Sequence, residues 1–360
     1  MQITEQGPNG ITRGMAATPR NAWYVAAGSV EIGDKLLARR ILDTPVVLFR
    51  TAAGEAVALL DRCPHRLMPL SLGTRIGDEI QCLYHGIQFA ASGKCTLIPS
   101  QKPIPKVMCV RRFPLVEKGP FAWIWVGDEA AMDPTLIPDP GRVQPHYSQF
   151  FNVCLPIKAD FLLMLENLMD TSHPTFLHAG YFDDGQLAGA PTTLEVEGNR
   201  VRLIRDIGIH VPGPGTTAWF RLDPGKRVHQ VTITETYAPS LNVIVYQFTY
   251  PDEPQRPMQE FIALAPITPS SQRECYHFVA TCTSWPEQGS TQMNDGVAAV
   301  IAGDQLALEA IELRRDDLGP EETEVHIRAD SASLALRRMI VSMAEKERAV
   351  ITAQRDRQSA

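Results

Sequence analysis

The sequence predicts an α+β protein of two domains: a small antiparallel β domain, then a larger domain whose antiparallel sheet is wrapped on helices. Residues 20–135 contain short apolar runs separated by glycine and proline turns, which is typical of β-hairpins. Residues 140–350 contain longer strand patterns and end in two helical patterns. A chain of 360 residues is long enough to bury two cores.

The first domain is expected to follow an N-terminal arm, residues 1–19, which is polar and interrupted by glycine and proline. Its strand pattern begins at Asn21-Ala-Trp-Tyr24 and ends in the aromatic run Phe121-Ala-Trp-Ile-Trp-Val126. Further strands are expected within 37–50 and 55–60, and Gly73, Gly77 and Gly93 mark later turns. The proline-rich stretch 133–140 predicts the boundary between the two domains.

The second domain is expected to open with a strand at 149–156 and an apolar helix at 159–169. Six further strands are predicted at 192–197, 200–207, 228–237, 241–250, 259–266 and 275–282. Two helices, 296–316 and 331–349, close the domain. The second has a plausible buried stripe of Leu334, Leu336, Ile340, Met343 and Ala344. Residues 351–360 are expected to form a C-terminal tail.

Composition excludes several classes of protein. The net charge of −7 argues against a nucleic-acid partner. No apolar run approaches the length of a transmembrane helix, and residues 1–20 lack the apolar core of a signal peptide. Of the seven cysteines, two are candidate metal ligands, and no paired spacing is found among the other five, Cys95, Cys109, Cys154, Cys275 and Cys282. This indicates reduced thiols and predicts a cytoplasmic protein. The absence of a long apolar run predicts that the protein does not bind membranes.

Two short motifs in the first domain carry metal-binding chemistry. Cys63-Pro-His65 is followed, after sixteen residues, by Cys82-Leu-Tyr-His85. A Rieske [2Fe–2S] cluster needs this donor set, with two cysteines on one iron and two histidines on the other. The alternative is a Cys2His2 zinc site, but zinc sites usually pair cysteine with cysteine. Mixed half-sites therefore favour the Rieske cluster.

A second group of candidate ligands follows the apolar helix of the second domain. His173 and His178 are five residues apart, so they do not share one face of a regular helix. Pro174 is expected to break the helix between them and let both imidazoles reach one point. A 2-His-1-carboxylate iron site also needs a carboxylate and open positions for O2. Asp304 is the best candidate, ahead of Glu309, Asp316 and Asp317.

Two further sets of residues are weaker candidates. Asp170 lies one helical turn before His173 and could accept a hydrogen bond from the second ring nitrogen of that ligand. The alternative is a solvated aspartate at a helix end. Asn242 and Phe248 share one face of a predicted strand and are candidates for a substrate pocket, but a strand that faces the core is the favoured interpretation.

The order of these motifs resembles the oxygenase component of Rieske non-haem iron oxygenases over residues 20–345. Arg20-Asn-Ala-Trp-Tyr, Ile41-Leu-Asp-Thr-Pro and Glu166-Asn-Leu-Met-Asp resemble the vanillate and dicamba O-demethylase branch. Leu83 departs from the proline often found there, and the strand after His85 lacks a frequent acidic residue. The resemblance implies a helix-grip, START-like catalytic domain.

The resemblance also implies a set of roles. Cys63, His65, Cys82 and His85 would hold the cluster, His173, His178 and Asp304 the mononuclear Fe(II), and Asp170 would link the two centres. It implies a head-to-tail homotrimer in which the cluster of one subunit serves the iron of the next. A flavin and iron–sulfur reductase, with or without a ferredoxin, would supply electrons from NAD(P)H, because the chain has no Gly-x-Gly-x-x-Gly turn.

These features predict a Rieske-type monooxygenase of the EC 1.14 class. It would use O2 to hydroxylate or to O- or N-demethylate a small aromatic substrate, as in aromatic catabolism. Three alternatives remain open from the sequence: a ring-hydroxylating dioxygenase that forms cis-diols, a Rieske-type electron carrier without oxygenase activity, and a zinc-stabilised binding module. An electron carrier would end near residue 110, and the long second domain argues against it.

Overall fold

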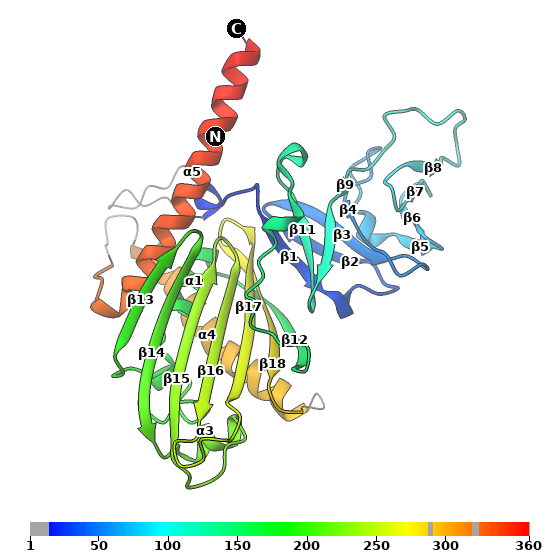
Figure 1. The fold of residues 1–360 in the computed structure, drawn as a ribbon. Helices are drawn as coiled ribbons and strands as arrows, with labels where there is room; N and C mark the ends of the chain where they lie inside the picture. Colours follow the sequence, from blue (N-terminus) through cyan, green and yellow to red (C-terminus); the bar gives the residue numbers. More distant parts are fainter. Residues whose placement is uncertain (1–13, 287–290, 319–323, 360) are drawn as a thin grey trace. The chain divides into compact units, whose positions relative to one another are not determined.

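The computed structural model describes residues 14–286, 291–318 and 324–359 (Figure 1). The chain divides into two compact units. One unit is Arg20–Ile137, and the other combines the residues before Arg20 with the chain from Pro138 onward. The predicted fold class is confirmed: an all-β unit is followed by one with a large antiparallel sheet and helices.

The unit Arg20–Ile137 contains three small antiparallel sheets. In the three-stranded sheet, β11 (Phe121–Trp125) lies between β1 (Trp23–Gly28) and β10 (Leu115–Lys118). A four-stranded sheet has the order β2 (Leu37–Ile41), β3 (Thr44–Arg50), β4 (Ala56–Leu60) and β9 (Arg112–Phe113). The other has the order β5 (Thr74–Ile76), β6 (Glu79–Gln81), β7 (Gln88–Ala90) and β8 (Cys95–Leu97).

The two four-stranded sheets share one hydrophobic core. Phe49 and Val57 from one sheet and Ile80 and Phe89 from the other are fully buried in it. Short 3-10 helices connect the strands: η2 (Ser29–Glu31), η3 (Leu70–Leu72), η4 (Glu129–Ala131) and η5 (Pro134–Leu136). The sulfur-bearing side chains of Cys63 and Cys82 belong to the same core, which therefore fixes the loops that carry them.

The other unit is built on a seven-stranded antiparallel sheet. Its order is β12 (Ser148–Ile157), β18 (Glu274–Thr283), β17 (Gln259–Ser271), β16 (Leu241–Thr249), β15 (Val228–Tyr237), β14 (Arg200–His210) and β13 (Thr192–Glu197). Every pair of consecutive strands from β13 to β18 is a hairpin neighbour, and β12 returns beside the last strand. Helices cover one face of this sheet, so its strands alternate apolar and polar residues. That alternation is the pattern from which the strands were predicted.

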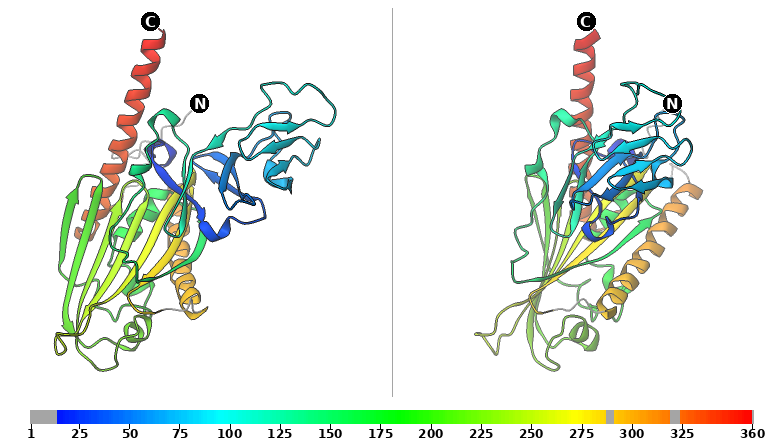
Figure 2. Two further views of the ribbon diagram at one scale, coloured as in Figure 1. Left: turned by 45° about the vertical axis from the view of Figure 1, so that its right-hand side comes forward. Right: turned by 90° about the vertical axis from the view of Figure 1, so that its right-hand side faces the viewer.

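Three helices cover that face: α1 (Phe161–Met169), α4 (Thr291–Leu318) and α5 (Ser331–Ser359) (Figures 1 and 2). Two short helices, α2 (Pro174–Leu177) and α3 (Pro214–Trp219), and the 3-10 turn η6 (Arg328–Asp330) lie in the connections. Residues 351–359, expected as a tail, instead continue α5. In the part of the chain that the structure describes, no helix is long and apolar enough to cross a membrane.

The expected N-terminal arm lies largely outside the described residues. Its described end forms the 3-10 helix η1 (Gly14–Ala17), which packs with the second unit. The Gly14 amide donates to Asp160 Oδ2 at 2.6 Å, and Ala17 is fully buried in the core around α1. Asp160 is also the N-cap of α1, since its Oδ1 accepts from the Leu162 amide at 2.7 Å.

Helix α1 is joined to α5 by a buried ion pair. The Arg337 guanidinium, which is 5% exposed, donates through Nε and Nη2 to the two carboxylate oxygens of Glu166. Ser333 Oγ also donates to the Glu166 carbonyl at 3.0 Å. The bidentate pairing fixes the orientation of α1, whose C-terminal end leads directly into the candidate iron ligands.

Arg337→Met is expected to destabilise the second unit by about 3 kcal/mol, because it leaves the Glu166 carboxylate buried without its charge partner. The Tm measured by calorimetry should fall by roughly 6–10 °C for a unit of this size. The exposed neighbour provides the matched control, since Arg338→Met removes the same charge outside the core. Equal Tm values for the two variants would show that the ion pair contributes nothing.

Candidate functional site: a cluster-binding pair of loops and a candidate iron centre

The two Cys-and-His motifs fold into two loops of the same backbone design. In the first, the Cys63 amide donates to the Met68 carbonyl at 2.8 Å and the Leu67 amide to the Cys63 carbonyl at 2.9 Å. In the second, Cys82 and Ile87 are joined in the same way, and the Gly86 amide donates to the Cys82 carbonyl at 3.1 Å. The fourth residue after each cysteine has a positive φ, +64° at Leu67 and +68° at Gly86.

The four predicted cluster ligands meet between these loops. The Cys63 and Cys82 side chains are buried in the same hydrophobic core. His65 and His85 are exposed, and their Nδ1 atoms lie 3.1 Å apart. Two thiols on the inside and two imidazole nitrogens on the outside match the ligand arrangement of a Rieske cluster.

The surroundings of the cysteines also suit a cluster. Burial raises the pKa of the Cys63 thiol, but the backbone N–H groups of His65 and Arg66 donate to its sulfur and oppose that shift. Such N–H donors favour an anionic sulfur ligand. The rim beside the two histidines is apolar, because Leu67, Leu83 and Tyr84 are each 62% exposed.

The second group of candidate ligands is assembled by a single short helix. Helix α1 ends at Met169, and Pro174 begins α2 instead of breaking a continuous helix. The prediction about Pro174 was therefore wrong in detail: the chain leaves the helix at Asp170, which has extended backbone angles. His173 and His178 are the residues that flank α2, and one helical turn brings their ring centroids to 5.2 Å.

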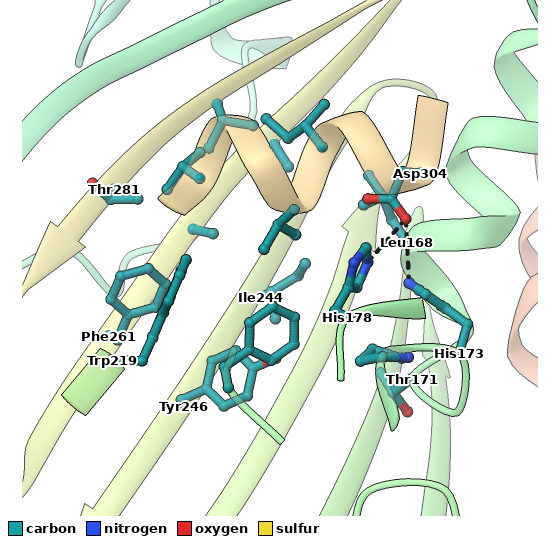
Figure 3. A pocket seen from close by; sticks show the side chains of 18 of the residues that line it. Leu168, Thr171, His173, His178, Trp219, Ile244, Tyr246, Phe261, Thr281 and Asp304 are labelled. Carbon is teal, nitrogen blue, oxygen red and sulfur yellow. Dashed lines mark hydrogen bonds and ion pairs between the residues drawn. The ribbon is translucent and has the colours of Figure 1, made fainter. Parts of the chain in front are cut away.

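Asp304 completes the group from helix α4 (Figure 3). Its Oδ1 lies 3.4 Å from His173 Nε2 and 3.1 Å from His178 Nε2. These are the residues of the described chain whose ligand atoms lie within 4.8 Å of one another and could hold a metal ion. Gly303 makes the approach feasible, because a Cβ at that position would lie only 3.3 Å from the His178 ring.

Hydrogen bonds to neighbouring groups orient these three side chains. Asn167, on α1, donates from Nδ2 to Asp304 Oδ1 at 2.9 Å. His173 Nδ1 lies 2.5 Å from the backbone carbonyl of Asp170, which makes Nδ1 the protonated nitrogen and leaves Nε2 to bind a metal. Burial raises the pKa of Asp304, but the two histidine side chains beside it outweigh burial and hold that pKa well below its usual range. The carboxylate is thus ionised and ready to bind a cation.

Asp170 contacts His173 through its backbone more closely than through its carboxylate. Its Oδ2 lies 3.9 Å from His173 Nδ1, whereas its Oδ1 accepts from the Ser172 amide at 2.8 Å and from Ser172 Oγ at 2.6 Å. The side chain is 28% exposed. The carboxylate therefore shapes the turn between α1 and α2 while it remains accessible from solvent.

The rival carboxylates lie elsewhere. Glu309 accepts from the Lys158 amide at 3.0 Å and from Gln305 Nε2 at 2.9 Å. Asp317 is paired with Arg314 at 3.4 Å. The side chain of Asp316 lies outside the described residues. Of the rivals with described side chains, neither points at the two histidines, so Asp304 is the carboxylate that the fold brings to them.

A cavity extends from the three ligands between the sheet and α4. Counted together with the open solvent at its mouth, the space inside it is about 800 Å³. Figure 3 shows Asp304, His173 and His178 at one end and Trp219, Phe261 and Thr281 at the other. Ile244 and Tyr246 form part of the wall between them, and Leu168 lies at the end that holds the three ligands.

The favoured interpretation of Asn242 and Phe248, that their strand faces the core, is confirmed, because both side chains are fully buried. Ile244 and Tyr246 line the cavity, whereas Asn242 and Phe248, on the same face of β16, do not. Asn242 Nδ2 instead donates to Thr236 Oγ1 at 2.8 Å, and Phe248 packs into an aromatic cluster with Phe220. His277 and Trp219 also line the cavity, and no motif singled them out.

Both units match known domain families. Residues 22–114 match the Rieske [2Fe-2S] domain, and residues 157–346 match the vanillate O-demethylase oxygenase C-terminal domain. The second match alone covers more than half of the chain. Each matched region contains one of the two groups of candidate ligands.

Curated relatives and solved structures agree with these matches. The chain is 31% identical to the oxygenase component of dicamba O-demethylase of Stenotrophomonas maltophilia, over 82% of this chain and 88% of that protein. It is 30% identical to the vanillate O-demethylase oxygenase subunit of a Pseudomonas strain, over 92% and 97% of the two chains. The crystal structure of dicamba monooxygenase bound to 3,6-dichlorosalicylic acid superposes with a TM-score of 0.84 at 29% identity, covering 92% of this chain and 98% of that one. The chain therefore belongs to the family of Rieske-type oxygenase components that includes the dicamba and vanillate O-demethylases.

Proposed function

We propose that the protein is the terminal oxygenase of a multicomponent Rieske monooxygenase that demethylates or hydroxylates a small aromatic substrate. The observation that carries the proposal is the group His173, His178 and Asp304 at one end of an apolar cavity, in a chain that also has a Rieske domain. A facial 2-His-1-carboxylate set with open positions is typical of non-haem Fe(II) oxygenases.

The proposal assigns each ligand a role. Cys63, His65, Cys82 and His85 hold a [2Fe–2S] cluster, and the buried thiols and facing imidazole nitrogens support that assignment. His173, His178 and Asp304 hold a mononuclear Fe(II). When bound, these two centres supply electron storage and O2 activation, which no side chain of the protein can provide. Asn167 and the Asp170 carbonyl keep the iron ligands in position.

The overall reaction balances for a methoxy substrate. One O2, two electrons and two protons convert the methyl ether into a phenol, formaldehyde and one water. Oxygen inserted into a methyl C–H bond gives a hemiacetal, which then loses formaldehyde. The cavity wall of Leu168, Ile244 and Tyr246 holds the ring, keeps bulk water away and presents one end of the substrate to the three ligands.

Partners complete the proposal. A flavin and iron–sulfur reductase, with or without a ferredoxin, supplies the electrons from NAD(P)H. The chain acts as a homotrimer in which Asp170 links the iron centre to the cluster domain of the neighbouring subunit. The exposed rim of Leu67, Leu83 and Tyr84 beside His65 and His85 supports such a docked arrangement. All seven cysteines lie in the described part of the chain and none of them forms a disulfide there, which supports a cytoplasmic location.

The test is turnover with a generic flavin and iron–sulfur reductase across a panel of methoxy, N-methyl and methyl aromatics. We expect formaldehyde in a 1:1 ratio with the demethylated product for a methoxy or N-methyl compound, and no NADH oxidation by the chain alone. A chain that oxidises NADH unaided would contradict the two-component proposal.

The same experiment separates the alternatives. Cis-diols without formaldehyde would favour a ring-hydroxylating dioxygenase. A reducible cluster with no oxygenated product from the panel would favour an electron carrier. A colourless protein that contains zinc, without iron and sulfide, would favour a zinc-stabilised binding module.

A further inference from the structure

His277 is a buried polar residue that is neither a candidate metal ligand nor a hydrogen-bond partner of one. It lies on β18 and is 2% exposed, and it lines the same cavity as the three candidate iron ligands. Neither ring nitrogen has a hydrogen-bond partner within the described part of the chain. A buried imidazole without partners is costly, and most buried polar groups in proteins are hydrogen-bonded.

Packing alone does not explain a histidine at this position. Its neighbours across the sheet are Leu155 on β12 and Ile267 on β17, both apolar. Val279 and Thr281, the next residues on the same face of β18, also line the cavity. A leucine or phenylalanine would fill the same space without an unpaired polar group. The missing partner is therefore best supplied by a molecule in the cavity.

The position of His277 along the cavity can be derived from the strand. Thr281 lies at the end remote from Asp304 (Figure 3), and His277 precedes it by four residues, or about 13 Å of extended strand. The Asp304 carboxylate also influences the pKa of His277. Both observations place His277 toward the end of the cavity that holds the iron ligands, so its partner lies near the atom that reacts.

The charge of the cavity defines which partner fits. Burial lowers the pKa of His277 to about 4, against the opposing effect of Asp304, so the ring is neutral at pH 7 and has one N–H donor and one nitrogen acceptor. The described residues that line the cavity include no lysine or arginine, and the carboxylates among them are Asp170 and Asp304. A buried anionic substituent would find no cationic side chain to pair with it.

We propose that His277 orients the substrate by hydrogen bonding to an uncharged polar group, such as a phenolic hydroxyl, next to the group that is oxidised. The substrate thus presents an uncharged hydrogen-bonding group close to the methoxy or N-methyl group that is oxidised. This inference rests on the proposed oxygenase function, since it uses the same cavity. It adds the residue that selects the substrate and the charge of the substituent that it selects.

Three probes of matched shape test the inference by calorimetric binding to the full-length chain, without reductase or turnover. Guaiacol carries the hydroxyl ortho to its methoxy group, 2-methylanisole replaces that hydroxyl by methyl, and 2-methoxybenzoate replaces it by an anion. We expect guaiacol to bind about tenfold more tightly than 2-methylanisole, as one hydrogen bond allows. We expect 2-methoxybenzoate to bind at least about tenfold more weakly than guaiacol.

Variants of His277 assign the preference to that residue. His277→Phe keeps a planar ring and should bind guaiacol and 2-methylanisole equally, whereas His277→Gln keeps an N–H donor and should retain part of the preference. Thr281→Val, on the same strand face, is the control that should leave the preference intact. If His277→Phe fails to fold, the wild-type ranking and His277→Gln still decide the question.

The inference is overturned if His277→Phe keeps the preference, if Thr281→Val removes it, or if 2-methoxybenzoate binds best. No saturable binding of guaiacol, or no preference because a water molecule satisfies His277, would also overturn it. These outcomes are independent of the proposed reaction. A chain that binds guaiacol through His277 but never forms formaldehyde with a reductase would refute the oxygenase proposal alone.

Discussion

Asp304→Ala is expected to abolish formaldehyde formation, to below about 1% of the wild-type rate, while the [2Fe–2S] cluster remains intact. Asp304 is the anionic member of the candidate iron site, and its Oδ1 lies within 3.4 Å of both histidine Nε2 atoms. Its loss leaves two neutral imidazoles in a buried site, which bind Fe(II) far more weakly than a set with a carboxylate. The cluster ligands lie in a separate unit and lose no contact.

Metal analysis gives a readout that does not depend on turnover. The ratio of iron to inorganic sulfide should fall from about 3:2 to about 2:2, and the visible spectrum of the cluster should be unchanged. Glu309→Ala is the matched control, because it removes a carboxylate from the same helix whose contacts are with Lys158 and Gln305. Retention of the third iron in Asp304→Ala, or its loss in Glu309→Ala, would show that the assigned carboxylate is wrong.

The segments that carry the candidate ligands could be predicted because cysteine and histidine occur there at short, characteristic spacings. Cys63-x-His65 and Cys82-x-x-His85 are local motifs, and the hairpins beside them follow from period-two apolar patterns. Asp304 lies far from His173 in the sequence, but it follows an apolar stretch of a helical pattern, which limited the choice to a few carboxylates. In the described part of the chain, the packing of α4 brings the Asp304 carboxylate beside His178, and Gly303 lies at the point of close approach.

The remainder of the site depends on tertiary packing that a single sequence does not specify. Pro174 was expected to interrupt a helix, yet Asp170 leaves the helix earlier, because its carboxylate binds the Ser172 amide and hydroxyl. The cavity positions on β16 could not be distinguished by alternation, since Asn242, Ile244, Tyr246 and Phe248 share one face. The helices that cover the sheet determine which of these residues line the cavity. His277 has no motif, and only its lack of a partner reveals it.

Asp170→Asn tests the proposed link between the two metal centres. Asparagine has the shape of aspartate, and its side-chain oxygen can still accept from the Ser172 amide, so the turn between α1 and α2 should persist. The His173 ring should also keep its orientation, because the Asp170 carbonyl, at 2.5 Å, is its close partner. The substitution therefore removes the negative charge near His173 with little effect on the fold or on either set of ligands.

If Asp170 only caps the turn, Asp170→Asn should have nearly wild-type activity and a stability change well below ~1 kcal/mol. If the carboxylate links the iron centre to the cluster domain of a neighbouring subunit, both metal contents and cluster reduction by dithionite should be normal. Product per reduced cluster in a single turnover should then fall by at least about tenfold, the lower end of the effect of losing a residue that supports a metal ligand.

Ser172→Ala separates the two explanations. It removes the 2.6 Å hydrogen bond from Ser172 Oγ to Asp170 Oδ1 but keeps the charge, so it perturbs the turn without touching the proposed link. We expect Ser172→Ala to give most of the wild-type product in the same single-turnover measurement. A full yield from pre-reduced Asp170→Asn at the wild-type rate, or an equal loss in Ser172→Ala, would show that Asp170 serves the turn rather than electron transfer.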